Sequence, residues 1–327
     1  MTADPIERKR KAEGDNAEAP MRRQRKVERE ERKRRREGGA EDEERLDGRL
    51  MAVTNDEEVT AEWEEEEEEW KGGLDPLQVE KGRLEETEYM IKKLDMFEFG
   101  SYEEALRRSG GKEPTTTKWV DTEKVDDDGE KFVRCRLVGR DFKPNHEGPR
   151  DDLFAAMPPL EAKKVLFAMV AGERGRRRRR GLKEIKLMFV DVKKAHLNAE
   201  CDEEEWVELP MEFWKWGRYA RLRRWLYGMR RAAVGWEDHY AEKLESIGFR
   251  RGIGAPTVFV NEVTGVRVVV HGDDFTFAGV KDELIKVKNA MAEWYEIKMR
   301  GILGSEPNET KEIKILGRTV KWTSEGI

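Results

Sequence analysis

Residues 266–280 read VRVVVHGDDFTFAGV, and this stretch decides the fold. Two apolar runs rich in β-branched and aromatic residues flank a short polar segment, which is the pattern of a β-hairpin with a tight turn. The hairpin would carry Asp273 and Asp274 at its tip. An acidic pair in such a position is most often turn chemistry alone, so its meaning depends on the rest of the chain.

A second stretch, IKLMFVDV at residues 185–192, predicts a buried strand with Asp191 near its end. Three carboxylates on rigid β-structure suit divalent metal binding, because Mg²⁺ prefers oxygen ligands and shares them with substrate phosphates. Two such ions can activate an attacking hydroxyl group and stabilise a leaving pyrophosphate. Asp191, Asp273 and Asp274 are therefore candidate catalytic and metal-binding residues.

The remaining patterns predict interleaved helices and hairpins, which indicates an α+β fold with helices packed on one face of a sheet. An Asp-Gly turn divides a hairpin over 118–138, and Arg176–Arg180 falls in a predicted loop over 172–181. Two interpretations of that loop stay open. It is either a contact with distal duplex or a partner, or a solvated insertion. Apolar spacing predicts helices over 78–97, 160–170, 234–248 and 282–297, and alternation predicts one strand over 311–322.

The charge of the 327-residue chain is strongly segregated. Residues 1–36 have a net charge of +6, residues 37–75 of −14, and the rest of +2, giving −6 in total. Residues 1–75 hold only two aromatic side chains, which predicts a disordered tail. Within it, Arg22–Arg36 is a basic arm, a nuclear-import signal or simply a solvated segment, so nucleus and cytoplasm both stay open. The run Glu64–Glu69 is read as a solvated acidic block.

Other classes of protein are excluded by composition. The two cysteines, Cys135 and Cys201, cannot form a disulfide framework. No run of about 18 apolar residues predicts a membrane span, and the N-terminus lacks the apolar core of a secretory signal. We therefore expect an intracellular, soluble protein without a membrane partner.

Six segments together resemble the reverse transcriptases of copia-type retrotransposons. The Asp191 segment, MFVDVKKAHLNAECDEEEWVELP, is similar to the first catalytic motif of that family, and VVVHGDDFTFAG is similar to its Tyr-Val-Asp-Asp hairpin. The other four are RLRRWLYGMRRAAVGWEDHYAEKLESIGFRRG, KWVDTEKVDDDGEKFVRCRLVGRDF, DDLFAAMPPLEAKKVLFAMVAG and KEIKILGRTVKW. All six are collinear over about residues 117–323. The His-Gly-Asp-Asp form is most similar to the divergent elements of dinoflagellate genomes.

The resemblance implies the fingers and palm of a right-hand polymerase. It implies an RNA-directed DNA polymerase with two Mg²⁺ or Mn²⁺ ions, an RNA or DNA template with primer, and deoxynucleoside triphosphates. The expected organisation is a tail over 1–75, a helical linker over 76–116, and fingers and palm over 117–327 that stop before the thumb and RNase H domains. The other segments of a Pol polyprotein are then expected partners. The alternative is an inactive retroelement fragment that acts at most as a nucleic-acid-binding module.

The resemblance also implies site residues. Asp191 and Asp273 would be the principal metal ligands, with Asp274 as a supporting carboxylate. Arg134, Arg136 and Arg140 would contact phosphate groups, and Gly272 would let the primer backbone approach. The nucleotide site would comprise Val192, Lys193, Lys194, Ala195, His196 and Arg231.

Two positions depart from the family pattern. His196 stands where an aromatic residue usually excludes a ribose 2′-hydroxyl, and Arg231 replaces a glutamine near the nucleotide. Imidazole is smaller and more polar than the usual ring, so discrimination between sugars should weaken. The simpler reading is that His196 only packs against its neighbours.

The substitution at His196 leads to a prediction about sugar selection. We expect the wild-type chain to incorporate ribonucleotides measurably, and His196→Phe to reject them more strongly, in primer extension with matched ribo- and deoxynucleoside triphosphates. Equal rejection by the two proteins would contradict a role in sugar selection.

Overall fold

The computed structural model describes residues 73–125, 129–142, 153, 155–156, 158, 160–315, 317–324 and 326–327. The predicted tail over 1–75, with its basic and acidic stretches, lies outside the described residues except for its last three positions.

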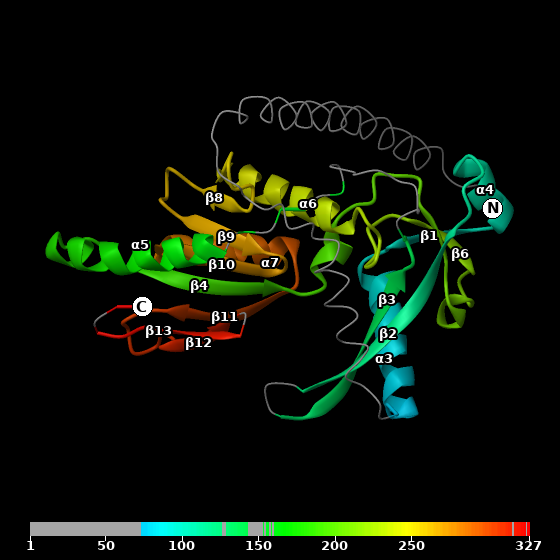
Figure 1. Cartoon of the computed structure of the whole chain (residues 1–327), viewed down its shortest axis with the longest axis horizontal. Coiled ribbons are helices and arrows are strands. Elements are labelled where there is room, and N and C mark those ends of the chain that lie inside the picture. Colours follow the sequence, from blue (N-terminus) through cyan, green and yellow to red (C-terminus); the bar gives the residue numbers. More distant parts are fainter. Residues whose placement is uncertain are drawn as a thin grey trace, which may run out of the picture. The chain divides into compact units, whose positions relative to one another are not determined.

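The first part of the described chain builds a mixed five-stranded sheet. Its elements are α3 (Pro76–Glu88), the π-helical turn η1 (Tyr89–Lys93), β1 (Phe97–Gly100), α4 (Tyr102–Arg108), β2 (Thr115–Val125) and β3 (Lys131–Gly139). Further along come β5 (Trp206–Glu208), the 3₁₀ turn η4 (Met211–Phe213) and β6 (Tyr219–Leu222). The strand order is β1-β6-β5-β2-β3. The predicted hairpin over 118–138 is confirmed as β2 and β3, which run beside α3 (Figure 1).

The second sheet has six strands in the order β11-β4-β10-β9-β8-β7, and all its neighbours are antiparallel. Its strands are β4 (Ile185–Val192), β7 (Arg250–Arg251), β8 (Val258–Val260), β9 (Arg267–His271), β10 (Asp274–Val280) and β11 (Ile297–Leu303). Helices α5 (Leu160–Arg179), α6 (Ala232–Ser246) and α7 (Lys281–Trp294) accompany it, together with the 3₁₀ turn η3 (Ala195–Asn198). The prediction of a fold that combines helices and strands is confirmed.

The hairpin predicted over 266–280 is confirmed as β9 and β10, with Asp274 opposite His271. Only Gly272 and Asp273 connect the paired residues, and Gly272 has a φ of 61°, in the left-handed region. A two-residue hairpin turn requires such a backbone, which glycine adopts without a Cβ clash. Space is not the constraint here, since a Cβ on Gly272 would meet nothing within 4 Å.

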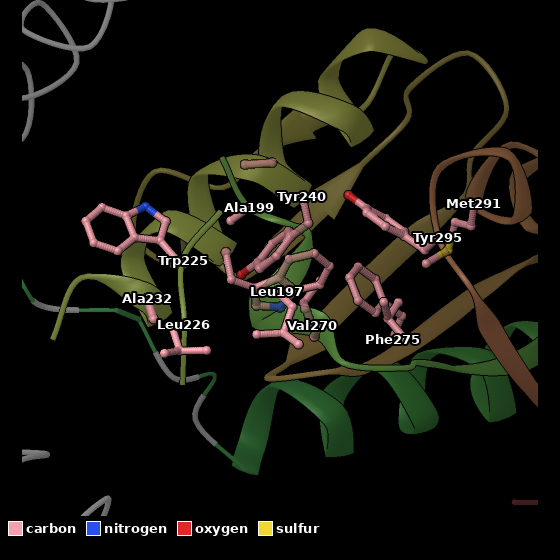
Figure 2. Close-up of a cluster of buried hydrophobic side chains, with 14 of the residues drawn as sticks. Leu197, Ala199, Trp225, Leu226, Ala232, Tyr240, Val270, Phe275, Met291 and Tyr295 are labelled. Atoms are coloured by element: carbon pink, nitrogen blue, oxygen red, sulfur yellow. The ribbon is translucent and has the colours of Figure 1, made fainter. Parts of the chain in front are cut away.

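The expectation that helices cover one face of a sheet is wrong. Alternate residues of β4 point to opposite sides, and each side has its own apolar cluster. Phe189 packs in the cluster that contains Leu166 and Val170 of α5, whereas Val190 belongs to the cluster with α6 and α7. In Figure 2, α5 lies across the sheet from α6. Because both faces are covered, β4 must be apolar almost throughout.

The larger cluster centres on aromatic rings of α6 and β10 (Figure 2). Trp236 packs edge-on against Tyr240, Phe275 and Tyr295, with ring centroids 5.4, 6.3 and 5.3 Å away. Its indole N–H donates to the carbonyl oxygen of Gly272 at 2.9 Å. The apolar face predicted for the helix over 234–248 is confirmed in α6. This face packs in the larger cluster and also hydrogen-bonds the hairpin turn through Trp236.

Three further expectations need correction. The helix predicted over 160–170 continues as α5 to Arg179, so most of the arginine run is helical and not in a loop. The single strand predicted over 311–322 is a hairpin of β12 (Glu312–Ile315) and β13 (Arg318–Lys321), because Gly317, with a φ of 67°, reverses the chain. The helical linker over 76–116 does contain α3 and α4, but β1 pairs with β6, and Met90 and Met96 are fully buried.

No helix in the described part of the chain is long and apolar enough to cross a membrane.

The hydrogen bond from Trp236 to the hairpin turn gives a stability prediction. Trp236→Phe keeps an aromatic ring but removes the donor, and we expect it to lower the free energy of unfolding by about 1–2 kcal/mol, measured by urea denaturation. Trp214→Phe is the matched control, since the exposed Trp214 also donates its indole N–H to a backbone carbonyl, that of Leu209 at 3.0 Å; it should cost less than Trp236→Phe, because water can replace this bond. Equal losses in the two variants would contradict the structural role of Trp236.

Candidate active site

Two of the three predicted carboxylates meet across paired strands. Asp191 of β4 lies opposite Asp274, the first residue of β10. The turn residue Asp273 accepts a hydrogen bond at its backbone oxygen from the N–H of Val192, at 3.0 Å. The pairing of β4 with β10 therefore places all three acidic residues at one end of the sheet.

Two basic side chains face these carboxylates. The Arg300 guanidinium lies 3.1 Å from Asp191 Oδ2 and 3.9 Å from Asp274 Oδ1. Lys163 of α5 is only 7% exposed, and its ammonium has no hydrogen-bond partner among the described residues. Burial lowers the pKa of Lys163, while the charges of Asp274 and Asp273 raise it. The site therefore has a cationic as well as an anionic part.

The environment of Asp274 shows how these charges balance. Burial raises the pKa of Asp274 above its usual value, and the nearby charges of Asp273 and Asp191 raise it further. Arg300 and Lys163 act in the opposite direction. Crowded carboxylates of this kind gain from any added cation.

The chemistry of this donor set fits a divalent metal, because it consists of carboxylate oxygens held on rigid strands. Asp191 and Asp274 keep 19% and 20% of their side-chain surface exposed, so a hydrated ion can reach both. The arrangement is not a finished metal centre. Within the described residues, no three His, Cys, Asp or Glu side chains are grouped closely enough to hold one ion.

The loop after Asp191 is held by backbone and side-chain contacts. Val192 and Ala195 have buried side chains, so only their backbone can face a ligand. The Lys193 N–H donates to Glu296 O at 2.9 Å, and its ammonium pairs with Glu296 Oε1 at 2.8 Å. Lys194 has a left-handed backbone, with a φ of 53°, and pairs with Glu86.

His196 lies beside Tyr227, with ring centroids 5.5 Å apart. Burial lowers the pKa of His196 to about 4, with a smaller contribution from the charge of Arg136. The imidazole is therefore neutral near pH 7. Burial also raises the pKa of Tyr227, so this ring pair is uncharged and largely enclosed.

The predicted phosphate-binding arginines divide into two groups. Arg134 and Arg136 lie two residues apart on β3, on the same face, and both charges act on Tyr227. The charge of Arg136 also acts on His196. Arg140 lies just beyond β3, and its side chain is exposed. Arg134 and Arg136 thus act electrostatically on the ring pair of His196 and Tyr227, and Arg140 is an exposed residue at the end of the hairpin.

Arg231 already has an acidic partner. It precedes α6, pairs with Glu203, and stacks over Trp225 with its guanidinium carbon 5.9 Å from the ring centroid. Its Nε is buried without a hydrogen-bond partner among the described residues. The pairing with Glu203 directs Arg231 towards the acidic segment after η3.

Sequence reasoning did not find several residues that shape this site. Arg300 falls in β11, a strand that the patterns did not predict, and Lys163 lies in the helix predicted over 160–170 from its apolar residues alone. Glu86 and Glu296 had no local signal, because each is defined by a partner more than a hundred residues away. Glu203 did have a sequence signal, because it belongs to an acidic run.

Comparisons with known proteins identify the family of the chain. Residues 104–306, more than half of the chain, match the family model described as "Reverse transcriptase (RNA-dependent DNA polymerase)". The chain is 24% identical, over 233 residues, to the retrovirus-related Pol polyprotein from transposon TNT 1-94 of Nicotiana tabacum. That alignment covers 68% of this chain but only 16% of the polyprotein.

Among solved structures, the chain is similar to apo telomerase from Candida tropicalis truncated from its C-terminal domain, with a TM-score of 0.38 and 9% identity. The match covers 74% of this chain and 58% of that one.

The family match spans both sheets, from α4 to the segment after β11, and includes all three aspartates. The expectation of a retrotransposon reverse transcriptase, drawn from the six motifs, is thereby confirmed at the level of the family. The chain belongs to the reverse transcriptase (RNA-dependent DNA polymerase) family.

Proposed function

We propose that this chain is the polymerase part of a retrotransposon reverse transcriptase, which adds deoxynucleotides to a primer 3′-hydroxyl on an RNA or DNA template. The observation that carries the proposal is the register of β4 and β10, which sets Asp191 opposite Asp274 beside the turn residue Asp273. On this view the six-stranded sheet is the palm, and β2 and β3 are the fingers.

The reaction is an in-line phosphoryl transfer. The primer O3′ forms a bond to the α-phosphorus of the nucleotide, and the bond from that phosphorus to the bridging oxygen breaks to release pyrophosphate. Catalysis of this kind depends mostly on positioning and charge neutralisation. Asp191, Asp273 and Asp274 would hold two Mg²⁺ or Mn²⁺ ions, which when bound activate the hydroxyl and neutralise developing charge.

The surrounding residues would orient the nucleotide. The backbone over Val192–Ala195 lies next to the carboxylates, where a triphosphate would be held. Arg134 and Arg136 would contact phosphate oxygens, and the neutral His196 would lie against the sugar. Arg300 and Lys163 compensate the carboxylates when no ion is bound, so Arg300 must release Asp191 when a metal enters.

The relatives suggest a larger context. The chain spans about a sixth of the length of the transposon polyprotein it matches. Other segments of a Pol polyprotein are accordingly proposed partners.

Substitution of the turn carboxylate tests the proposed activity. With a homopolymer RNA template, a DNA primer and Mg²⁺ or Mn²⁺, wild-type chain should extend the primer, and Asp273→Asn should lose at least about a hundredfold in rate. Asp282→Asn is the control, because Asp282 is an exposed residue of α7 paired with Lys183, and it should extend normally. Template binding without extension by the wild type would instead support the inactive nucleic-acid-binding module.

The partly buried imidazole gives a separate prediction about pH. Because the pKa of His196 is lowered to about 4, the unfolded chain binds a proton between pH 6.5 and 4 that the folded chain does not. Wild-type stability should therefore fall as pH drops through this window, by up to about 1.4 kcal/mol per pH unit from this group. His196→Phe should lack that contribution, so its stability relative to wild type should rise at low pH.

Urea denaturation of both proteins between pH 8 and 4.5 measures this difference. The difference should be flat from pH 8 to 7, which is the internal control. A constant difference across the whole range would show that His196 is not held neutral by the fold.

A further inference from the structure

The backbone at Lys194 is unusual for its residue type. Its φ of 53° is in the left-handed region, which costs free energy for residues other than glycine and, to a lesser degree, asparagine. The conformation matters because the Lys194 carbonyl accepts hydrogen bonds from Leu197 N–H at 3.0 Å and from Asn198 Nδ2 at 3.1 Å. These bonds close a turn over residues 194–198, which contains His196.

A buried acid holds this lysine. Glu86 of α3 pairs with the Lys194 ammonium, and the glutamate side chain is only 7% exposed. The same ammonium lies 3.8 Å from the centroid of the Tyr89 ring, a cation–π contact. Glu86 and Thr87 are the buried residues of α3, which is unusual because a packed helix normally buries apolar side chains.

Helix α3 is itself anchored to the five-stranded sheet. Arg83 donates to Asp121 Oδ2 of β2 from Nη2 at 2.6 Å and from Nε at 3.2 Å, and it pairs with Glu212 at 3.0 Å. A bidentate arginine–carboxylate pair fixes orientation as well as distance. The carboxylate of Glu86 is therefore presented to the loop from a rigid support.

A second acid holds the neighbouring lysine. Glu296, just before β11, pairs with Lys193 and with Lys93 of η1. These pairs lower the pKa of Glu296 to about 2. Both lysines after Asp191 are thus tied to acids from distant parts of the chain, but only Glu86 is buried.

We propose that Glu86 is a positioning residue for the nucleotide loop. Its buried carboxylate holds Lys194 and thereby the left-handed backbone that aligns residues 192–196 with the catalytic carboxylates. The nucleotide part of this inference rests on the proposed polymerase function, whereas the effect on the loop does not. Helix α3 lies upstream of residues 104–306, so this role is outside the segment that defines the family.

Hydrogen–deuterium exchange of the full chain tests the effect on the loop without any catalysis. In Glu86→Gln, exchange of the backbone amides over residues 192–199 should be about tenfold faster than in wild type. Lys194→Asn added to this variant should return exchange to within about twofold of wild type, because asparagine tolerates the left-handed backbone without an ion pair. Glu88→Gln is the matched control, since Glu88 lies on the same helix, is 44% exposed and pairs with Lys92 on the surface.

Two results would overturn the inference. One is unchanged exchange in Glu86→Gln. The other is a double variant that exchanges as fast as Glu86→Gln, which would show a general loss of packing and not a loss of backbone support.

Steady-state kinetics tests the effect on the nucleotide. Glu86→Gln should raise KM for deoxynucleoside triphosphate about tenfold with kcat within about twofold, whereas the control Glu88→Gln should leave both unchanged. An unchanged KM in an active Glu86→Gln enzyme would overturn the nucleotide part. If the wild type does not extend primers, the proposed function fails, and the exchange result alone decides the role of Glu86.

Discussion

The pairing of β10 with β4 is the constraint on which the site depends. It sets Asp274 opposite Asp191, and the hydrogen bond from Val192 N–H to Asp273 O fixes the turn against the end of β4. A slip of one residue would turn every side chain of β10 to the other face and separate the two carboxylates. The apolar clusters on both faces of the sheet prevent such a slip, because Phe275 and Ala278 belong to different clusters.

The same arrangement explains the heavy use of charge. Bringing three carboxylates to one end of a sheet is unfavourable without compensation, and Arg300 and Lys163 supply it. Basic residues that a sequence reading assigns to nucleic acid, such as Lys193 and Arg231, are also paired with acids inside the protein. A high charge content here therefore reflects, at least for these residues, ion pairing within the protein.

Local patterns were enough to predict β4, the hairpin of β9 and β10, and α6. The spacing of apolar residues along each of these elements matches the repeat of a strand or of a helix. They could not predict that α5 and α7 cover opposite faces, since that depends on which strands become neighbours. The residues of the candidate site also divide into those that local patterns predict and those that they do not. The aspartates follow from motifs, but Glu86 and Arg300 act through ion pairs with Lys194 and Asp191 across 108 and 109 residues of chain.

The folding unit is larger than the segment that identifies the family. Residues 104–306 leave out β1, which forms the edge of the five-stranded sheet against β6. They also leave out Ile313 and Trp322, which complete the apolar cluster over α5. Because Ile313 and Trp322 pack in the same cluster as Phe189 of β4 and Ala278 of β10, the segment after residue 306 helps to hold the two strands that carry the carboxylates. The segment that matches the family contains the three aspartates, while residues outside it help to fix the positions of the strands that carry them.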